Sequence, residues 1–149
     1  MSEKPRVTRA GMGVMVRNSE GKILMGLRNT DAALADSDLH GEGTWTMPGG
    51  KFEFGEGLLE GAKRELLEET GIVLKSAQII SITNEVSDSA HFITIGFLAT
   101  EYEGEPKVME PDEILSWEWF ALDNLPKNIY IPTKKLIENY VAKRLTGEF

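Results

Sequence analysis

The chain of 149 residues is 41% hydrophobic and 27% charged, which suits one globular domain that buries roughly 70% of its unfolded surface. It has no cysteine, which excludes disulfides, thiolate metal sites and cysteine nucleophiles, and its net charge of −8 argues against nonspecific nucleic-acid binding. No segment approaches the roughly 20 apolar residues of a membrane span, and the N-terminal segment lacks the apolar core of a signal peptide. We therefore expect a single cytoplasmic domain over residues 1–149, with neither a membrane nor a nucleic-acid partner.

The first part of the chain is predicted to contain short strands around a polar loop. Residues 12–28 have the pattern of two strands joined by a turn at residues 18–21. Residues 29–43 are polar and longer than most connections, and such loops are often functional or mobile. Short extended segments are expected around Trp45 and Phe52.

A helix is predicted over residues 58–70, because an apolar stripe with helical spacing is followed by Gly71 at the position that a helix C-cap favours. The stripe consists of Leu59, Ala62 and Leu66. We expect this stripe to face the core.

The second half of the chain predicts three strands and a helix. Residues 77–86 and 91–102 are rich in β-branched and aromatic residues, and residues 116–122 alternate as a short strand does. The last helix is predicted over residues 132–145, with Pro132 near its start. Its apolar residues at helical spacing are Leu136, Ile137, Tyr140, Val141 and Leu145. Because strands outnumber helices and a helix interrupts their series, we expect an α/β fold with a mixed sheet flanked by helices.

Three glutamates of the first helix are predicted to share one face. Glu65 and Glu69 lie one turn apart and Glu68 lies about 60° from Glu65, so their carboxylates occupy an arc of roughly 100°. The arc borders the apolar stripe, whereas Glu60 points about 140° away from Glu65. Clustered carboxylates on a rigid element bind hard cations such as Mg²⁺ or Mn²⁺. The alternative is an ordinary solvated acidic face.

A longer pattern surrounds this helix. It begins with Gly50, continues with Glu56, and ends with Arg64-Glu65-Leu66, Glu68-Glu69 and Gly71-Ile72. These nine positions match, without a gap, the Nudix box: Gly, five residues, Glu, seven residues, Arg-Glu-aliphatic, one residue, Glu-Glu, one residue, Gly-aliphatic. With average residue frequencies, a chance match is expected roughly once in 10⁹ starting positions. The chain therefore resembles a Nudix hydrolase over essentially its whole length.

The resemblance implies a fold, a reaction and a metal site. Nudix hydrolases share an α/β/α sandwich and cleave a nucleoside diphosphate linked to a further moiety, by water attack at phosphorus with divalent metals. We therefore expect Mg²⁺, with Mn²⁺ as a substitute. Carried over by position, the metal ligands would be Glu65, Glu68, Glu69 and a backbone carbonyl of the Gly49-Gly50 turn.

The resemblance also implies supporting roles. Arg64 would orient the glutamates and act in catalysis, with Glu56 as its partner; the alternative for Arg64 is a helix-surface pair with Glu60 or Glu68. The general base would be Glu65 or a glutamate further along the chain.

Residues 103–119 resemble the MutT-related branch of the family. In that branch the sequence Glu-Gly-Glu-Pro is followed, four positions later, by an acidic residue that meets the metal site. Here that residue is Glu110, and Glu113 is the nearby alternative. Both could instead be ordinary polar loop residues.

The same segment narrows the substrate. Members acting on ADP-ribose have a proline about fifteen residues beyond the box, and those acting on dinucleotide polyphosphates have a tyrosine slightly further on; neither residue type occurs from 73 to 101. Residues 105–126 instead resemble a branch that handles nucleoside triphosphates, including oxidised or modified purines. We therefore predict hydrolysis of a nucleoside triphosphate to a monophosphate and pyrophosphate. The alternatives are a metabolic diphosphatase acting on a pterin triphosphate, an isoprenyl diphosphate or ADP-ribose, and a non-catalytic nucleotide sensor.

Six residues are candidates for substrate binding, by hydrogen bonding or stacking on a base or by contact with phosphate: Arg28, Trp45, Lys51, Asn84, Thr94 and Trp117. Each also has a structural alternative. Trp117 and Trp119 alternate on a predicted strand, so one of them should face the core. Asn84 could cap a turn, Thr94 could be a simple strand residue, and Lys51 a surface lysine. A homodimer is expected from the resemblance.

Overall fold

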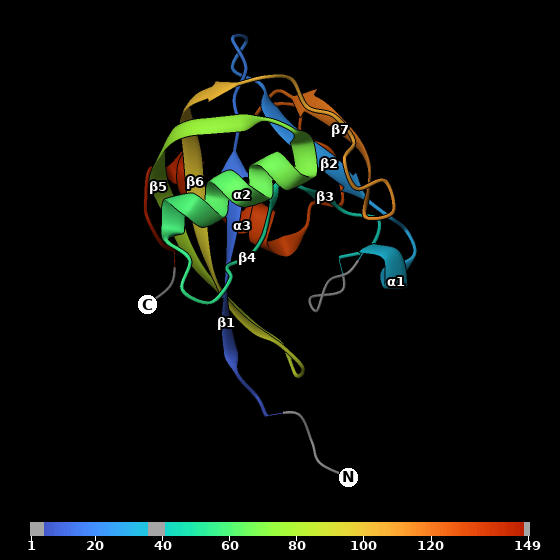
Figure 1. The fold of residues 1–149 in the computed structure, drawn as a ribbon, viewed down its shortest axis with the longest axis vertical. Coiled ribbons are helices and arrows are strands. Elements are labelled where there is room, and N and C mark those ends of the chain that lie inside the picture. The colour runs from blue at the N-terminus through green and yellow to red at the C-terminus, as the bar shows by residue number, and fades with distance from the viewer. Residues whose placement is uncertain (1–4, 36–40, 148–149) are drawn as a thin grey trace.

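The structure is a computed structural model that describes residues 5–35 and 41–147 (Figure 1). Its strands are β1 (Thr8–Met15), β2 (Ile23–Arg28), β3 (Trp45–Thr46), β4 (Gly49–Lys51), β5 (Val73–Val86), β6 (His91–Glu103) and β7 (Ile114–Phe120). Its helices are α1 (Ala32–Ala35), α2 (Leu58–Thr70) and α3 (Ile131–Ala142). Each segment predicted as a strand or helix therefore contains one, with shifts at the ends. The short helix α1 lies in the predicted loop 29–43, of which residues 36–40 lie outside the described residues.

The strands form two sheets. The four-stranded sheet has the order β4-β1-β6-β5 and is mixed, because β1 and β6 run parallel whereas the other pairs are antiparallel. The other sheet, β3-β2-β7, is antiparallel. The predicted turn between β1 and β2 is present, with a hydrogen bond from Gly21 N to Asn18 O of 3.0 Å. The predicted mixed sheet is confirmed, and this turn also carries the chain from one sheet to the other.

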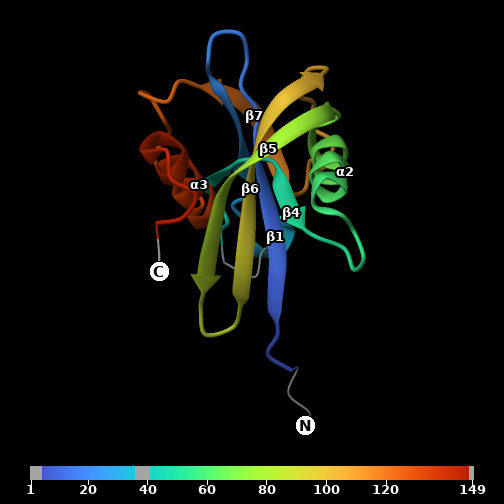
Figure 2. The same cartoon turned by 90° about the vertical axis from the view of Figure 1, so that its left-hand side faces the viewer.

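The helices cover the mixed sheet from both sides. Figure 2 shows α2 and α3 on opposite sides of strands β1, β4, β5 and β6. On the α2 side, Ala62 and Leu66 are fully buried in a cluster with Met12 and Val14 of β1. The other cluster contains Leu136 and Ile137 of α3, together with Met15, Ile23, Met25 and Met47. The expected α/β/α arrangement is confirmed.

The helix α2 begins and ends at the predicted residues. Gly71 adopts a left-handed conformation with φ of 77°, and its N–H donates to Leu67 O at 2.9 Å. The predicted stripe is partly wrong, because Leu59 is 38% exposed whereas Gly61 is buried. The reason is packing: a Cβ at Gly61 would lie 2.6 Å from the ring of Phe52, so the helix turns this glycine toward the loop before it.

The helix α3 is shorter than predicted. It ends at Ala142, and Lys143 adopts a left-handed conformation with φ of 54°. Val141 is 63% exposed and Leu145 is 47% exposed, so neither of these apolar residues belongs to the buried face of α3. Asn139 lies there instead and donates Nδ2 to Ser81 Oγ at 2.9 Å. Within the described residues, no helix is long and apolar enough to cross a membrane.

Candidate active site

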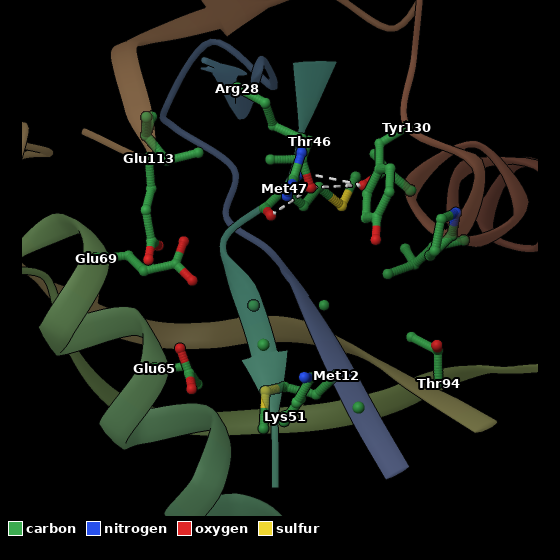
Figure 3. A pocket seen from close by; sticks show the side chains of 18 of the residues that line it. Met12, Arg28, Thr46, Met47, Lys51, Glu65, Glu69, Thr94, Glu113 and Tyr130 are labelled. Atoms are coloured by element: carbon green, nitrogen blue, oxygen red, sulfur yellow. Dashed lines mark hydrogen bonds between the residues drawn. The ribbon is translucent and has the colours of Figure 1, made fainter. Parts of the chain in front are cut away.

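A pocket of about 320 Å³ lies beside α2 and extends toward α3 (Figure 3). The strands β1 and β4, with glycines at several positions, form part of its lining, and β6 and the N-terminal end of α3 form another part. The antiparallel pairing of β4 with β1 places Gly49 and Gly50 opposite Gly13 and Met12. These glycines keep the centre of the pocket free of side chains.

Five glutamates line this pocket: Glu65, Glu68, Glu69, Glu110 and Glu113. Glu65 and Glu69 lie one turn apart on α2 and point into the pocket in Figure 3. Glu69 is 9% exposed, whereas the side chain of Glu68 is 53% exposed. The predicted cluster on α2 is therefore brought together with Glu110, which lies far along the chain.

Burial and mutual repulsion disfavour the charged form of these carboxyl groups. Burial raises the pKa of Glu69 well above its usual value, and the charges of Glu65 and Glu110 raise it further. The pKa of Glu65 is raised mainly by burial, against the opposing effect of Arg64. Burial and then the charges of Glu65 and Glu68 raise the pKa of Glu110. The site therefore concentrates negative charge that a cation would compensate.

Arg64 connects the helix to the loop before it. Its Nε donates to Glu56 Oε2 at 2.6 Å, and its Nη2 donates to Glu56 Oε1 at 3.0 Å. Its Nη1 donates to Glu65 Oε1 at 2.8 Å and to Glu68 Oε2 at 3.2 Å. The hydrogen bonds from Arg64 and from the Glu53 backbone N–H lower the pKa of Glu56 to about 2. The pair with Glu56 and the surface pair with Glu68, which the sequence left as alternatives, both occur.

The predicted Gly49-Gly50 turn is instead part of strand β4, and this strand requires glycine at both positions. A Cβ on Gly50 would lie 2.6 Å from Cδ of Glu65, and a Cβ on Gly49 would collide with the carbonyl oxygen of Met12. The main chain therefore passes directly against the carboxylate of Glu65. The backbone N–H of Gly49 also donates a hydrogen bond to the Glu69 carboxyl group, which opposes the rise in the pKa of Glu69.

The carboxylates and the main chain around them have the chemistry of a divalent-cation site. Within the described residues, no three carboxylates or imidazoles converge on one point, and Arg64 Nη1 holds both Glu65 and Glu68. The donor set nevertheless fits a hard cation, because it consists of oxygens, is partly buried, and the charges of Glu65 and Glu110 add to the burial of Glu69. The residues that could hold the ion are Glu65, Glu68, Glu69, Glu110 and the Gly49-Gly50 main chain.

Three of the six predicted substrate residues line the pocket: Arg28, Lys51 and Thr94. The guanidinium of Arg28 lies 4.7 Å from the ring centre of Tyr130, and its Nε donates to Gly41 O at 3.0 Å. Lys51 Nζ lies 5.8 Å from the ring centre of Phe92. Glu113, the alternative to Glu110, also lines the pocket.

The other three lie elsewhere among the described residues. Trp45 packs edge-on against Phe120, with ring centres 5.0 Å apart. Trp117 packs against Gly26, where an added Cβ would lie 2.7 Å from the indole. Asn84 shares a hydrogen bond of 2.5 Å with His91 Nε2.

Two aromatic residues of the pocket are absent from the sequence prediction. Tyr130 precedes α3 and projects into the pocket (Figure 3). Phe92 lies on β6 beside Lys51. No local pattern marks either residue, because each becomes part of the pocket only when α3 and β6 pack beside β1.

This fold and this glutamate-bearing helix together define the class of protein. The NUDIX domain model matches residues 7–140, and the chain therefore belongs to the Nudix family. Among curated proteins, the chain is similar to the NAD-capped RNA hydrolase NudC of Stutzerimonas stutzeri (strain A1501), with 33% identity over 134 residues. That match covers 87% of this chain and 46% of NudC, so the chain spans about half the length of this relative.

Two further relatives match over nearly their whole length. The RNA pyrophosphohydrolase of Bartonella quintana (strain Toulouse) is 30% identical over 158 residues, which covers 93% of this chain and 90% of that protein. The crystal structure of a MutT NUDIX hydrolase from Burkholderia pseudomallei superposes with a TM-score of 0.79 and 30% identity. The superposition covers 90% of this chain and 98% of the Burkholderia pseudomallei chain.

Proposed function

We propose that this chain is a divalent-metal-dependent hydrolase that converts a nucleoside triphosphate, including an oxidised or otherwise modified one, to a monophosphate and pyrophosphate. The observation that carries the proposal is that Glu65, Glu69 and Glu110 line one pocket, where burial and repulsion raise the pKa of all three. A divalent cation would compensate this charge together with that of a bound polyphosphate. The likeness to a MutT NUDIX hydrolase supports the same reaction.

The metal would be Mg²⁺, with Mn²⁺ as a substitute, held by Glu65, Glu68, Glu69, Glu110 and a main-chain carbonyl of Gly49 or Gly50. When bound, the metal would neutralise phosphate charge and acidify a water. Arg64 would keep Glu65 and Glu68 oriented through its bonds to both.

Water would attack phosphorus while a carboxylate oxygen of Glu65 or Glu110 accepts its proton. The bond between the attacked phosphorus and the oxygen that bridges the α- and β-phosphorus would break, which releases the monophosphate and pyrophosphate. Lys51, at the edge of β4, would contact the phosphates, while Arg28 and Thr94 would contact the rest of the nucleotide. This role accords with the cytoplasmic location predicted from the sequence.

A second candidate is hydrolysis of a pyrophosphate on RNA. It is favoured by one observation: the similarity to the RNA pyrophosphohydrolase of Bartonella quintana extends over 90% of that protein. The phosphoanhydride chemistry would be the same. The net charge of −8 opposes it, because phosphate contacts along an RNA strand depend on basic residues.

The test is pyrophosphate and phosphate release from a substrate panel, with Mg²⁺, with Mn²⁺ and with chelator. The panel contains normal and 8-oxo nucleoside triphosphates, CTP, ADP-ribose, dihydroneopterin triphosphate, geranyl diphosphate, 5′-triphosphorylated RNA and NAD-capped RNA. We expect metal-dependent pyrophosphate release from a nucleoside triphosphate. Faster release from RNA would favour the second candidate, and no release from any substrate would contradict both.

The predicted homodimer is tested separately by light scattering. A mass of one chain at micromolar concentration would contradict it.

A further inference from the structure

A buried carboxylate lies behind the wall of the pocket that is opposite α2. Glu85 of β5 is 4% exposed and Thr94 of β6 is 8% exposed. Thr94 Oγ1 donates to Glu85 Oε1 at 2.6 Å. Thr94 lines the pocket, and Figure 3 shows it across the pocket from Glu65 and Glu69. The hydroxyl of Thr94 therefore connects a buried acid to the ligand space.

Glu85 forms an ion pair with a lysine of α3. Lys135 of α3 places its Nζ 3.9 Å from Glu85 Oε2 and also donates to Asn84 O at 2.7 Å. Among the described residues, none donates a hydrogen bond to Glu85 Oε2, although this atom is buried. Burying a carboxylate with an incomplete set of hydrogen bonds costs free energy, and an apolar side chain would fill the same space without this cost. The acid is therefore better explained by what it does to Thr94 than by stability.

Glu85 Oε1 accepts the hydrogen bond from Thr94 Oγ1, so this carboxyl group determines the direction of the Thr94 hydroxyl. The hydroxyl proton points to Glu85, and the oxygen lone pairs remain for the pocket. The β1–β6 register places Gly11 beside Thr94, so no side chain from β1 covers it. Leu136 and Phe92 supply apolar lining nearby. A ligand therefore meets a hydrogen-bond acceptor in apolar surroundings at this wall.

We propose that Thr94, oriented by Glu85, selects a nucleotide whose base presents an amino group to this wall. A carbonyl at the same place on the base would meet a second acceptor and would be rejected. Thr94 is then a specificity-determining residue, and Glu85 is a positioning residue that acts through it. This inference rests on the proposed function, because it assumes that a nucleotide occupies the pocket with its phosphates toward α2.

The test uses two pairs of nucleoside monophosphates that differ by an amino group and a carbonyl: CMP with UMP, and AMP with IMP. Dissociation constants are measured by calorimetry for the unmodified chain and for Thr94→Val, Thr94→Ser and Glu85→Gln. In at least one pair, we expect the nucleotide with the amino group to bind roughly tenfold more tightly. The reason is that its amino group donates a hydrogen bond to Thr94 Oγ1, whereas a carbonyl leaves this buried acceptor without a donor.

The variants separate orientation from structure. Thr94→Val should bring the ratio of the two dissociation constants close to one, and Thr94→Ser should preserve it. In Glu85→Gln the amide can donate to Thr94, so the hydroxyl can turn toward the pocket and the ratio should shrink or reverse. Thr100→Val is the matched control, because Thr100 is exposed on β6 and bonds Ser76 Oγ at 2.7 Å. A merely structural role would change the affinity for both members equally and leave the ratio unchanged.

Each outcome decides the inference. An equal affinity for both members of each pair in the unmodified chain overturns it, as does a ratio that survives Thr94→Val. The absence of binding of all four monophosphates at millimolar concentration also overturns it. Nucleotide hydrolysis with equal affinities would contradict this inference alone. Amino selectivity that Thr94→Val removes, without hydrolysis of any substrate in the panel, would contradict the proposed function alone.

Discussion

Arg64 donates two parallel hydrogen bonds to Glu56, from Nε to Oε2 at 2.6 Å and from Nη2 to Oε1 at 3.0 Å. These bonds hold one edge of the guanidinium against the loop before α2. The remaining nitrogen, Nη1, then reaches Glu65 and Glu68. The positions of Glu65 and Glu68 therefore depend on Glu56, which does not line the pocket, because the planar guanidinium of Arg64 contacts all three glutamates.

Arg64→Lys should disturb these positions. A lysine has one nitrogen and cannot bond Glu56 at two points while it also holds Glu65. We expect Mn²⁺ affinity, measured by electron paramagnetic resonance titration, and kcat each to fall by roughly 10- to 100-fold. Lys63→Arg, at an exposed neighbouring position, should change neither. An unchanged Mn²⁺ affinity in Arg64→Lys would refute this account of Arg64.

Glu69→Gln should abolish most activity without unfolding the chain. Removal of a metal ligand should lower kcat by at least about 100-fold. With chelator present, the midpoint of thermal unfolding of Glu69→Gln should equal or exceed that of the unmodified chain. The reason is that the substitution replaces a buried carboxyl group, whose pKa is raised by burial, with a neutral amide. Adding Mg²⁺ should raise the midpoint of the unmodified chain more than that of the variant. Glu60→Gln, at an exposed position of α2, is the control; normal turnover in Glu69→Gln would contradict the metal assignment.

Gly50→Ala should displace the carboxylate of Glu65. The new methyl would lie 2.6 Å from Cδ of Glu65, so one of the two groups must move. We expect weaker metal binding and a loss of kcat larger than the change in the free energy of unfolding would explain. The matched change Gly57→Ala meets only the flexible end of Glu60, at 3.1 Å, and should retain turnover. Equal activity in the two variants would be incompatible with this packing.

The ion pair between Glu56 and Arg64 should give a specific pH dependence of stability. The pKa of Glu56 is lowered in the fold to about 2 from 4.5, so the folded state binds its proton less readily than the unfolded state. Its contribution to stability is therefore fully present above pH 4.5 and is lost as the pH falls toward 2. The difference in unfolding free energy between the unmodified chain and Glu56→Gln, measured by urea denaturation, should shrink across this window. A difference that does not vary with pH would contradict the pairing.

Lys51→Met and Asn84→Ala should separate the candidates that line the pocket from those that do not. Lys51 lines the pocket beside Gly50, and loss of its charge should raise KM for a triphosphate by roughly tenfold. The side chain of Asn84 bonds His91 instead, so Asn84→Ala should leave KM unchanged. Steady-state kinetics of both variants on one substrate provides the comparison. A rise in KM for Asn84→Ala alone would reverse this assignment.

The part of the candidate site that lies on α2 could largely be predicted from the sequence. The helix over residues 58–70 follows from its spacing and from Gly71, and spacing alone places Glu65 and Glu69 on one face. Such features depend on residues that are close in sequence, where backbone geometry determines which side chains meet. The Nudix resemblance added Glu110, which the structure brings into the same pocket.

Other features depended on packing between distant segments. The sequence alone could not tell whether Trp117 or Trp45 would line the pocket, because their positions depend on β7 and β3 pairing with β2. The exposure of Val141 follows from Asn139 taking the buried position near Ser81. The contact between Glu85 and Thr94 exists only because β5 and β6 pair in this register.

The sequence by itself therefore determined the family, the glutamate helix and the order of the strands and helices. The tertiary structure alone decided which side chains enclose the ligand space, and it placed Tyr130, Phe92 and the buried Glu85 near that space. The physical reason is range: helix periodicity and capping act over a few residues, whereas the pocket forms between α2, β6 and α3, whose contacts depend on how the whole core packs.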